Sequence, residues 1–295
     1  MPELPDIKIY VDALKERIEG HALEGMRIAN PFVVRSVLPR PADIGGLAVV
    51  GVGHQAKRIV IALQQDISIF IHLMIAGRLH WRERGAVLRG RNHLAALDFD
   101  NGTLVLTEAG TKRRASIHLA QGEKAAARFD QGGLDPLVIS EAAFRQRLSR
   151  ENHTLKRALT DQKLLGGIGN AYSDEILLAA RLSPFKQTQG MTDDEWQRLY
   201  TATRDTLNIW IDRLRQEVGS DFPKKVTAFR EGMAVHGRYR KPCPVCGSPV
   251  QRIVYAENEA NYCARCQTGE RLLADRSLSR LLKDNWPKKL EDLEE

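Results

Sequence analysis

The apolar residues near the N-terminus recur at the spacing of an amphipathic helix. In PDIKIYVDALKERIEG, residues 5–20, they are separated by acidic and basic side chains at intervals of three and four. This period places them on one helical face. Pro5 and Asp6 suit the first turn, because proline has no amide hydrogen to satisfy there and a carboxylate favours the positive end of a helix. The apolar positions are Ile7, Val11, Leu14 and Ile18.

After this helix the pattern changes to short β-branched runs that are broken by Gly, Asn and Asp. Such runs are typical of strands, and the Asn-Gly pair at 101–102 is a hairpin signal. A series of short strands predicts a sheet that packs into a sandwich or closes into a barrel. The runs are VVGVGHQ, RIVIALQQ, ISIFIHLM, HLAALDFD and GTLVLTEA.

From about residue 140 the apolar period becomes helical, and GGLDP at 132–136 is interpreted as the linker before this part. Short strands return over 234–268, and the last residues predict one helix and a charged tail. The sequence therefore predicts an α+β protein of several domains. The predicted domains are 1–133, 134–234, 235–268 and 269–295. The helical runs are SEAAFRQRLSR, TLKRALTDQKLL, NAYSDEILLAARL and TDDEWQRLYTATRDTLNIWIDRLRQEV.

Composition narrows the class of partner. The chain of 295 residues carries 44 Lys and Arg against 37 Asp and Glu, a net charge of +7. This balance favours a polyanionic partner, nucleic acid first and an acidic membrane surface second. No apolar run reaches the ~18 residues that a membrane span needs, and the N-terminus lacks the apolar core of a signal peptide. We therefore expect nucleic acid and no membrane.

The cysteines form two CxxC pairs separated by sixteen residues, 247–262. Each CxxC turn can present two thiolates to one ion, and a hairpin between the pairs can return the second turn. The spacing therefore predicts one structural Zn²⁺ in a tetrahedral site, with two disulfides or an iron–sulfur site as alternatives. The basic residues of HGRYRK, together with Arg252 and Arg265, favour a nucleic-acid finger, although a plain structural clip remains an alternative. The cysteines are Cys243, Cys246, Cys263 and Cys266.

A glycine-rich turn precedes one of the predicted helices. In KLLGGIGNAYSDE, the residues Gly166, Gly167 and Gly169 permit a sharp turn and the close approach of another backbone. Asn170 can cap the helix that follows, and N–H groups at a helix start attract phosphate. The element is either a grip on a DNA backbone or a tight corner between helices that binds nothing.

Three motifs taken together resemble one family. The N-terminal PELP, the GIGNxYxDE run and the CPxCG…YCxxCQ hairpin are similar to those of the formamidopyrimidine-DNA glycosylase and endonuclease VIII family. The resemblance extends from Pro2 to Gln267 and leaves the last residues as an extension. It implies an N-terminal β-sandwich with a leading helix, a helical helix-two-turn-helix domain and a C-terminal zinc-finger β-hairpin.

The resemblance also implies an activity, that of a bifunctional DNA glycosylase and AP lyase in base excision repair. Such enzymes flip a damaged nucleotide out of double-stranded DNA, cut its glycosidic bond and then cleave the backbone. An α-amine has a pKa of about 7.7–8, against ~10.4 for lysine, so much of it is an unprotonated nucleophile near neutral pH. The secondary amine of Pro2 can form a cationic iminium with the sugar C1′, provided that Met1 is removed.

Further roles follow from the same resemblance. Glu3 resembles the family's proton donor, with a helix-dipole carboxylate as its alternative reading. Asp6 stands where the family usually has glutamate, and we expect it to support the terminus through a backbone hydrogen bond. Lys57, which we group with the catalytic residues, matches a lysine that contacts phosphate beside the lesion, although an ordinary exposed lysine is its alternative. His72 and Asn170 match residues near the DNA backbone, and such contacts provide affinity rather than sequence reading.

The chain departs from the family in its predicted DNA contacts. The finger's usual phosphate-binding arginine is replaced by Asn258. Ile75 stands at the position of a methionine that fills the gap left by the flipped base, and Arg113 and Arg114 are candidates for the rest of this wedge. The loop before the finger, EVGSDFPKKVTAFREGM, looks shorter than the loop that covers the flipped base in oxidised-purine enzymes. These changes weaken the case for 8-oxoguanine as the substrate.

Several functions remain open on the sequence alone. The leading hypothesis is the glycosylase and lyase, acting on an oxidised pyrimidine, a ring-opened purine, an abasic site or another bulky lesion. The alternative is a DNA-structure binder on the same scaffold whose catalysis is weak or lost. A zinc-finger protein associated with RNA or the ribosome would rest on charge and cysteines only. We expect a monomer in a bacterial-type cytoplasm, associated with the nucleoid.

Overall fold

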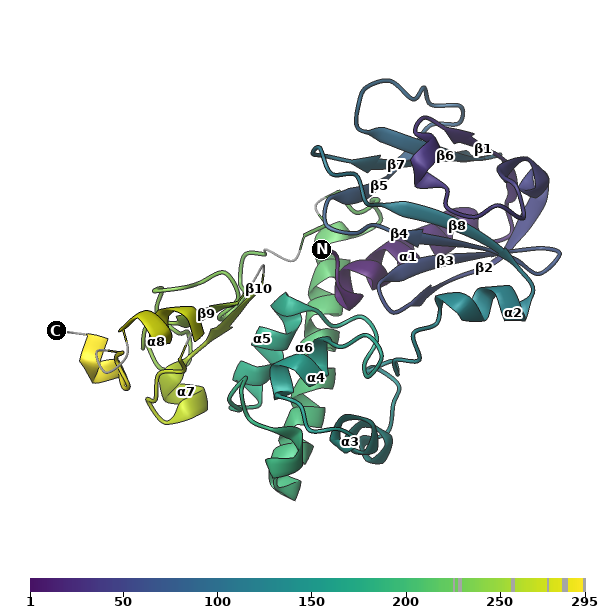
Figure 1. Cartoon of the computed structure of the whole chain (residues 1–295). Coiled ribbons are helices and arrows are strands. Elements are labelled where there is room, and N and C mark those ends of the chain that lie inside the picture. The colour runs from purple at the N-terminus through teal and green to yellow at the C-terminus, as the bar shows by residue number, and fades with distance from the viewer. Residues whose placement is uncertain (225, 228–229, 256–257, 275, 283–285, 294–295) are drawn as a thin grey trace. The chain divides into compact units, whose positions relative to one another are not determined.

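The computed structural model describes residues 1–224, 226–227, 230–255, 258–274, 276–282 and 286–293 (Figure 1), without the side chains of 255, 258 and 276–278. The chain forms two compact units. The first comprises Met1–Gln131 and Trp210–Thr227, and the second comprises Gly132–Ile209 and Ala228–Glu295. The change of unit after Gln131 lies at the GGLDP segment, and the finer domain boundaries stay predictions.

The first unit is a helix packed on a two-layer β-sandwich. Its eight strands follow the order β5-β7-β6-β1-β2-β3-β4-β8, and the two layers join where β1 and β2 pair through Ala22–Ala48 and Leu23–Leu47. The ends of this order, β5 and β8, are not paired, so the sandwich is confirmed and the barrel is not. The helices are α1 (Leu4–Ile18), α2 (Glu123–Ala126) and the residues of α6 (Asp193–Val218) from 210. The strands are β1 (Ala22–Ile28), β2 (Leu47–Gln55), β3 (Arg58–Leu63), β4 (Ile67–His72), β5 (Gly77–Arg82), β6 (His93–Phe99), β7 (Gly102–Glu108) and β8 (Ser116–Gln121).

The core of this unit joins alternate residues of the strands to the apolar face of α1. On β3, Ile59 and Ile61 are fully buried while Val60 between them is not, which is the period of two that a half-buried strand requires. The apolar face predicted for the first helix is confirmed, because Ile7 and Leu14 have no exposed surface and belong to the same cluster as both layers. The packing of α1 on β2 and β3 therefore fixes the N-terminal end of the chain.

The hairpin predicted at 101–102 connects β6 and β7, where Phe99 pairs with Gly102. The glycine has a different purpose from the one that the Asn-Gly signal suggests. A Cβ on Gly102 would lie 2.3 Å from the ring of Trp81, so this residue is a glycine because an indole packs on its backbone.

The second unit contains the predicted helices and the cysteine hairpin. The helices are α3 (Glu141–Ser149), α4 (Leu155–Thr160), α5 (Asn170–Ala179), the residues of α6 (Asp193–Val218) up to 209, α7 (Ala264–Thr268) and α8 (Arg276–Leu282), and the strands are β9 (Gln251–Tyr255) and β10 (Asn258–Tyr262). Phe144 on α3 packs edge-on against Trp196 and Tyr200 of α6, at centroid distances of 6.4 and 5.6 Å. Helices α4 and α5 pack on each other, and the β9–β10 hairpin forms a separate small sheet (Figure 1).

The segment after the cysteines packs on one face of the hairpin. Ile253, Tyr262 and Leu272 form a buried cluster, joined by the partly buried Leu273. The amide of Leu273 donates to the Tyr262 hydroxyl at 2.8 Å, and burial raises the pKa of that phenol to about 12. The sequence predicted only a helix and a charged tail here. The structure shows that the beginning of this extension is part of the finger's hydrophobic core.

No helix in the described parts of the chain is both long enough and apolar enough to cross a lipid bilayer.

We predict that Leu272→Ala lowers the local stability of the hairpin by about 2–3 kcal/mol, because it removes a buried side chain from a small cluster. The measurement is hydrogen exchange of the amides of β9 and β10. Leu281→Ala is the matched control, since Leu281 follows in the same extension but is 78% exposed, against 7% for Leu272. Equal exchange in the two variants would show that the extension does not support the hairpin.

Candidate active site and metal centre

The chain begins in a buried turn at the head of α1. Pro2 is buried, and Glu3, which occupies the N-cap position, is 3% exposed. The amide of Glu3 donates to Asp6 Oδ2 at 2.9 Å, so the backbone-supporting role expected of Asp6 is confirmed. Pro5 lies in the first turn as predicted. Because Leu4 and Ile7 are buried in the same turn, the terminus is held in one place rather than left to fray.

Burial lowers the pKa of the α-amino group, which in the full chain belongs to Met1. The carboxylates of Glu3 and Asp6 act in the opposite direction, and Lys57 and Arg78 lower the pKa further. The charges of these four side chains therefore all act on the amine. An amine in this position is more often unprotonated at neutral pH than an exposed one, which is what a nitrogen nucleophile requires.

Lys57 and His72 lie near each other, Lys57 just before β3 and His72 at the end of the neighbouring strand β4. Lys57 is 7% exposed and lies in the turn between β2 and β3, and His72 pairs in register with Arg58 beside it. Burial, followed by the charges of Arg58 and Lys57, lowers the pKa of His72 to about 4. His72 is therefore neutral at pH 7 in the free protein.

Ile75 is displayed on a tight turn between β4 and β5. It is 63% exposed, and the turn is closed by the amide of Gly77, which donates to the Leu73 carbonyl at 2.9 Å. A Cβ on Gly77 would lie 2.2 Å from that carbonyl oxygen, so only glycine fits. Arg78 also supports the turn, since its guanidinium donates to the Ile75 carbonyl at 3.3 Å. Neither supporting residue was predicted from the sequence.

Arg113 and Arg114 are exposed in the loop between β7 and β8. A buried carboxylate that sequence reasoning missed anchors this loop. Glu108 Oε2 accepts the amides of Arg114 and Ala115 at 2.8 and 2.9 Å. The final glutamate of the run GTLVLTE could have signalled this role, because a carboxylate at the end of an apolar strand needs partners when it is buried.

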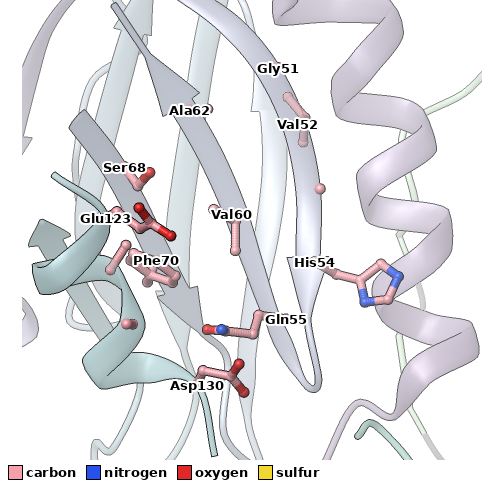
Figure 2. Close-up of a pocket in the computed structure, with 13 residues that line it drawn as sticks. Gly51, Val52, His54, Gln55, Val60, Ala62, Ser68, Phe70, Glu123 and Asp130 are labelled. Atoms are coloured by element: carbon pink, nitrogen blue, oxygen red, sulfur yellow. The ribbon is translucent and has the colours of Figure 1, made fainter. Parts of the chain in front are cut away.

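A hollow of the first unit lies elsewhere, on the outer face of β2, β3 and β4 beside α2. Its volume is about 550 Å³. Figure 2 shows Val60 and Ser68 on its strand floor, with Glu123 and Asp130 on the helical side. Among the described residues that line it, none is a predicted site residue, so the hollow is separate from the candidate active site.

The glycine turn of the second unit is built around the side chain of Gln162. Its Oε1 accepts the Gly167 amide at 2.8 Å, and its Nε2 donates to the Ile168 carbonyl at 2.7 Å. Gly167 has φ +94°, a conformation that requires glycine. The expectation that Asn170 caps the next helix is wrong. Gly169 is the N-cap, and Asn170 is the first residue of α5, half-buried at the helix start where phosphate-binding amides occur.

Two of the remaining predicted features lie partly outside the described residues. Asn258 begins β10 and pairs with Tyr255 through its backbone, but its side chain is not described. The loop predicted to be short, 217–233, is interrupted at 225 and 228–229. The roles assigned to both stay predictions.

The four cysteines converge to form a metal centre. Their Sγ atoms all lie within 4.8 Å of one another, and none is in a disulfide. Four sulfurs bound to zinc at ~2.3 Å would lie about 3.8 Å apart, so the cluster fits one tetrahedral Zn²⁺. Burial raises the pKa of the Cys266 thiol to about 11 and also raises that of Cys263, so a cation is needed for both to ionise at neutral pH.

Comparison with known proteins gives one consistent result along the chain. Residues 1–117 match the formamidopyrimidine-DNA glycosylase N-terminal domain, residues 133–219 match the formamidopyrimidine-DNA glycosylase H2TH domain, and residues 240–269 match the zinc finger found in FPG and IleRS. Residues 270–295 lie beyond these matches.

Individual relatives agree. The chain is 31% identical over 282 residues to a formamidopyrimidine-DNA glycosylase of Heliobacterium modesticaldum, covering 90% of this chain and 100% of the relative. It is 40% identical over 151 residues to a formamidopyrimidine-DNA glycosylase-like protein of Mycobacterium tuberculosis, covering 51% of this chain and 94% of that protein. The fold is similar, with a TM-score of 0.77, to Lactococcus lactis Fpg solved with DNA containing an abasic site, at 22% identity over 90% of this chain and 99% of that one.

We predict that the denatured protein shows four free thiols and releases about one equivalent of zinc, since the four sulfurs fit one ion. Removal of the metal by a chelator should unfold the residues around 243–266 while β3 and β4 keep their hydrogen-exchange protection. Absence of free thiols in protein prepared from a reducing cell lysate would instead indicate disulfides.

Proposed function

The chain belongs to the formamidopyrimidine-DNA glycosylase family, and we propose that the residues at the head of α1 carry out the chemistry of that family's reaction. The protein is a DNA glycosylase of base excision repair, and AP-lyase activity is a feature of its family. The observation that carries the proposal is the buried terminus itself. Pro2 and Glu3 are buried, Asp6 accepts the Glu3 amide, and the charges of Glu3, Asp6 and Lys57 act on the α-amine of Met1, whose pKa burial lowers.

In the proposed first step the nitrogen of Pro2, freed by removal of Met1, attacks C1′ of the flipped nucleotide. The C1′–O4′ bond breaks with its electron pair on oxygen, and Glu3 donates the proton that this oxygen takes. Loss of the amine proton then lets the nitrogen lone pair expel the base, which leaves with the electrons of the glycosidic bond and is protonated. The product is an iminium between Pro2 and C1′.

The iminium prepares the second step, because its positive charge acidifies the hydrogens on C2′. Loss of one of them and departure of the 3′ phosphate cleave the backbone, and hydrolysis of the iminium then releases Pro2. Lys57 lies near the amine, so its proposed contact with the phosphate beside the lesion would also fix the sugar above Pro2.

Binding is proposed to rest on contacts from both units. Asn170 at the start of α5 would bind a phosphate, and the exposed Ile75 would fill the space left by the flipped base, with Arg113 and Arg114 beside the duplex. Asn258, which stands where the family usually has a cation, would contact the DNA from the finger. We propose a monomer that acts on chromosomal DNA in the cytoplasm.

The preferred lesion is proposed to be an abasic site or a damaged base other than 8-oxoguanine, on the strength of Ile75 and Asn258. The replacement of a cation by Asn258 also favours a second candidate, a DNA-structure binder with weak catalysis. The two candidates differ in whether a covalent intermediate forms.

We predict that borohydride traps a covalent complex between this protein and a duplex with one abasic site, with the adduct on Pro2. Glu3→Gln should trap more slowly, by about 10²–10⁴-fold, because it removes the proton donor. Pro2→Gly replaces the secondary amine with a primary amine at the same terminus, and so tests whether the reaction needs the secondary amine. Binding of the duplex without any adduct would favour the structure binder.

We predict that Lys57→Ala and Asn170→Ala each weaken DNA binding, and that each does so by a similar factor whatever the base sequence of the duplex. Because Lys57 would neutralise a phosphate, its variant should reduce the slope of log affinity against log salt by about one. Lys288→Ala, at an exposed position in the C-terminal extension, is a basic control outside the family match. A salt slope that Lys57→Ala leaves unchanged would contradict its phosphate contact.

A further inference from the structure

A buried polar network occupies the interior of the second unit and is not explained by metal binding or by the reaction. At its centre is Asp174 on α5, which is 1% exposed. Lys156 Nζ on α4 forms an ion pair with Asp174 Oδ1 at 2.5 Å, and Lys156 is only 2% exposed. Taking two charges out of water is costly, and in some proteins a buried pair fixes a particular arrangement of segments.

The network reaches the glycine turn through Lys156. The same Nζ donates to the carbonyl of Asn170 at 2.7 Å. Asn170 is the first residue of α5, where the proposed phosphate contact is made. Lys156 therefore fixes the backbone of that residue from inside the unit.

The network reaches the finger through the second oxygen of the same carboxylate. Asp174 Oδ2 accepts from His236 Nδ1 at 2.8 Å and from Asn261 Nδ2 at 3.3 Å. His236 lies in the segment that leads into the zinc site, and Asn261 lies on β10, two residues before Cys263. The Asp174 carboxylate thus contacts Lys156, the segment that leads into the zinc site and strand β10.

The neighbouring residue makes the connection rigid. Glu175 accepts the backbone amides of Ala234, Val235 and His236 at 2.7, 2.9 and 3.0 Å. Hydrogen bonds to a buried carboxylate are among the stronger ones, and three in succession leave this segment little freedom. The Asp-Glu pair of the GIGNxYxDE motif therefore explains how α5 holds the segment before the finger.

We propose that Asp174 and His236 are positioning residues for DNA binding. They tie the phosphate-binding turn at Asn170 to the zinc finger, so that neither can be displaced without the other. This inference rests on the proposed function, because it concerns the contact that Asn170 makes with DNA.

The test is a double-mutant cycle on the affinity of the zinc-loaded protein for a duplex with a stable abasic-site analogue. His236→Leu should weaken binding about tenfold, because it leaves a buried carboxylate oxygen short of a donor. His236→Asn should restore affinity to within about threefold, since its amide nitrogen can take the place of Nδ1 as the donor. Combining His236→Leu with Asn170→Ala should cost clearly less than the product of the two separate losses.

The controls separate positioning from folding and from the proposed function. All variants should hold one equivalent of zinc, and Glu195→Gln, which breaks the Lys186–Glu195 pair elsewhere in this unit, should leave affinity unchanged. If His236→Leu folds poorly, Asn261→Ala enters the same cycle.

Two outcomes would count against these ideas in different ways. If the losses of affinity in His236→Leu and Asn170→Ala simply multiply in the double variant, the two positions are not coupled. The proposed phosphate contact of Asn170 would then still stand. An Asn170→Ala variant that binds as tightly as the parent would instead overturn the phosphate contact itself, and with it this part of the proposed function.

Discussion

The proposed chemistry of this protein depends on where its first helix begins. Because α1 is anchored by the packing of Ile7 and Leu14 on the sandwich, its first turn holds Pro2 and Glu3 in a buried position. The hydrogen bond from the Glu3 amide to Asp6 closes that turn. Burial lowers the pKa of the Met1 α-amine beside this turn, and the carboxylates of Glu3 and Asp6 offset part of that effect. A packing constraint in the core is thus what makes a chain terminus a candidate nucleophile.

In the second unit, too, a buried helix positions the residues at its start, and that helix is α5. Helix α5 begins at the glycine turn, carries Asp174 and Glu175 on its buried side, and packs through Leu178 against Val235, Cys243 and Cys263. Zinc closes the finger, and α5 orients it. The extension after the cysteines covers the opposite side of the hairpin through Leu272. The finger is therefore supported by metal, by buried charge and by apolar contact, which compensates for its small size.

Much of this could be predicted from the sequence, because the relevant signals are local. The period of the first helix, the alternation of the strands and the spacing of the cysteines each report a nearby physical requirement. The failures involve contacts between distant residues. Gly102 is a glycine because of Trp81, the loop of Arg114 depends on Glu108, and His72 is neutral because it is buried beside Arg58 and Lys57. The prediction that Asn170 is a cap was wrong by one residue, because Gly169 takes that position.

The most direct test of the central claim compares two forms of the protein that differ only in Met1. Met1 is 39% exposed and lies before α1, so retaining it should leave the fold intact while it converts the nitrogen of Pro2 into an amide. Strand cleavage at an abasic site would be measured for both forms, with each terminus verified by mass. We expect cleavage by the form that begins at Pro2 and only background cleavage by the form that keeps Met1. Equal cleavage by the two forms would show that the nucleophile is not the N-terminal amine.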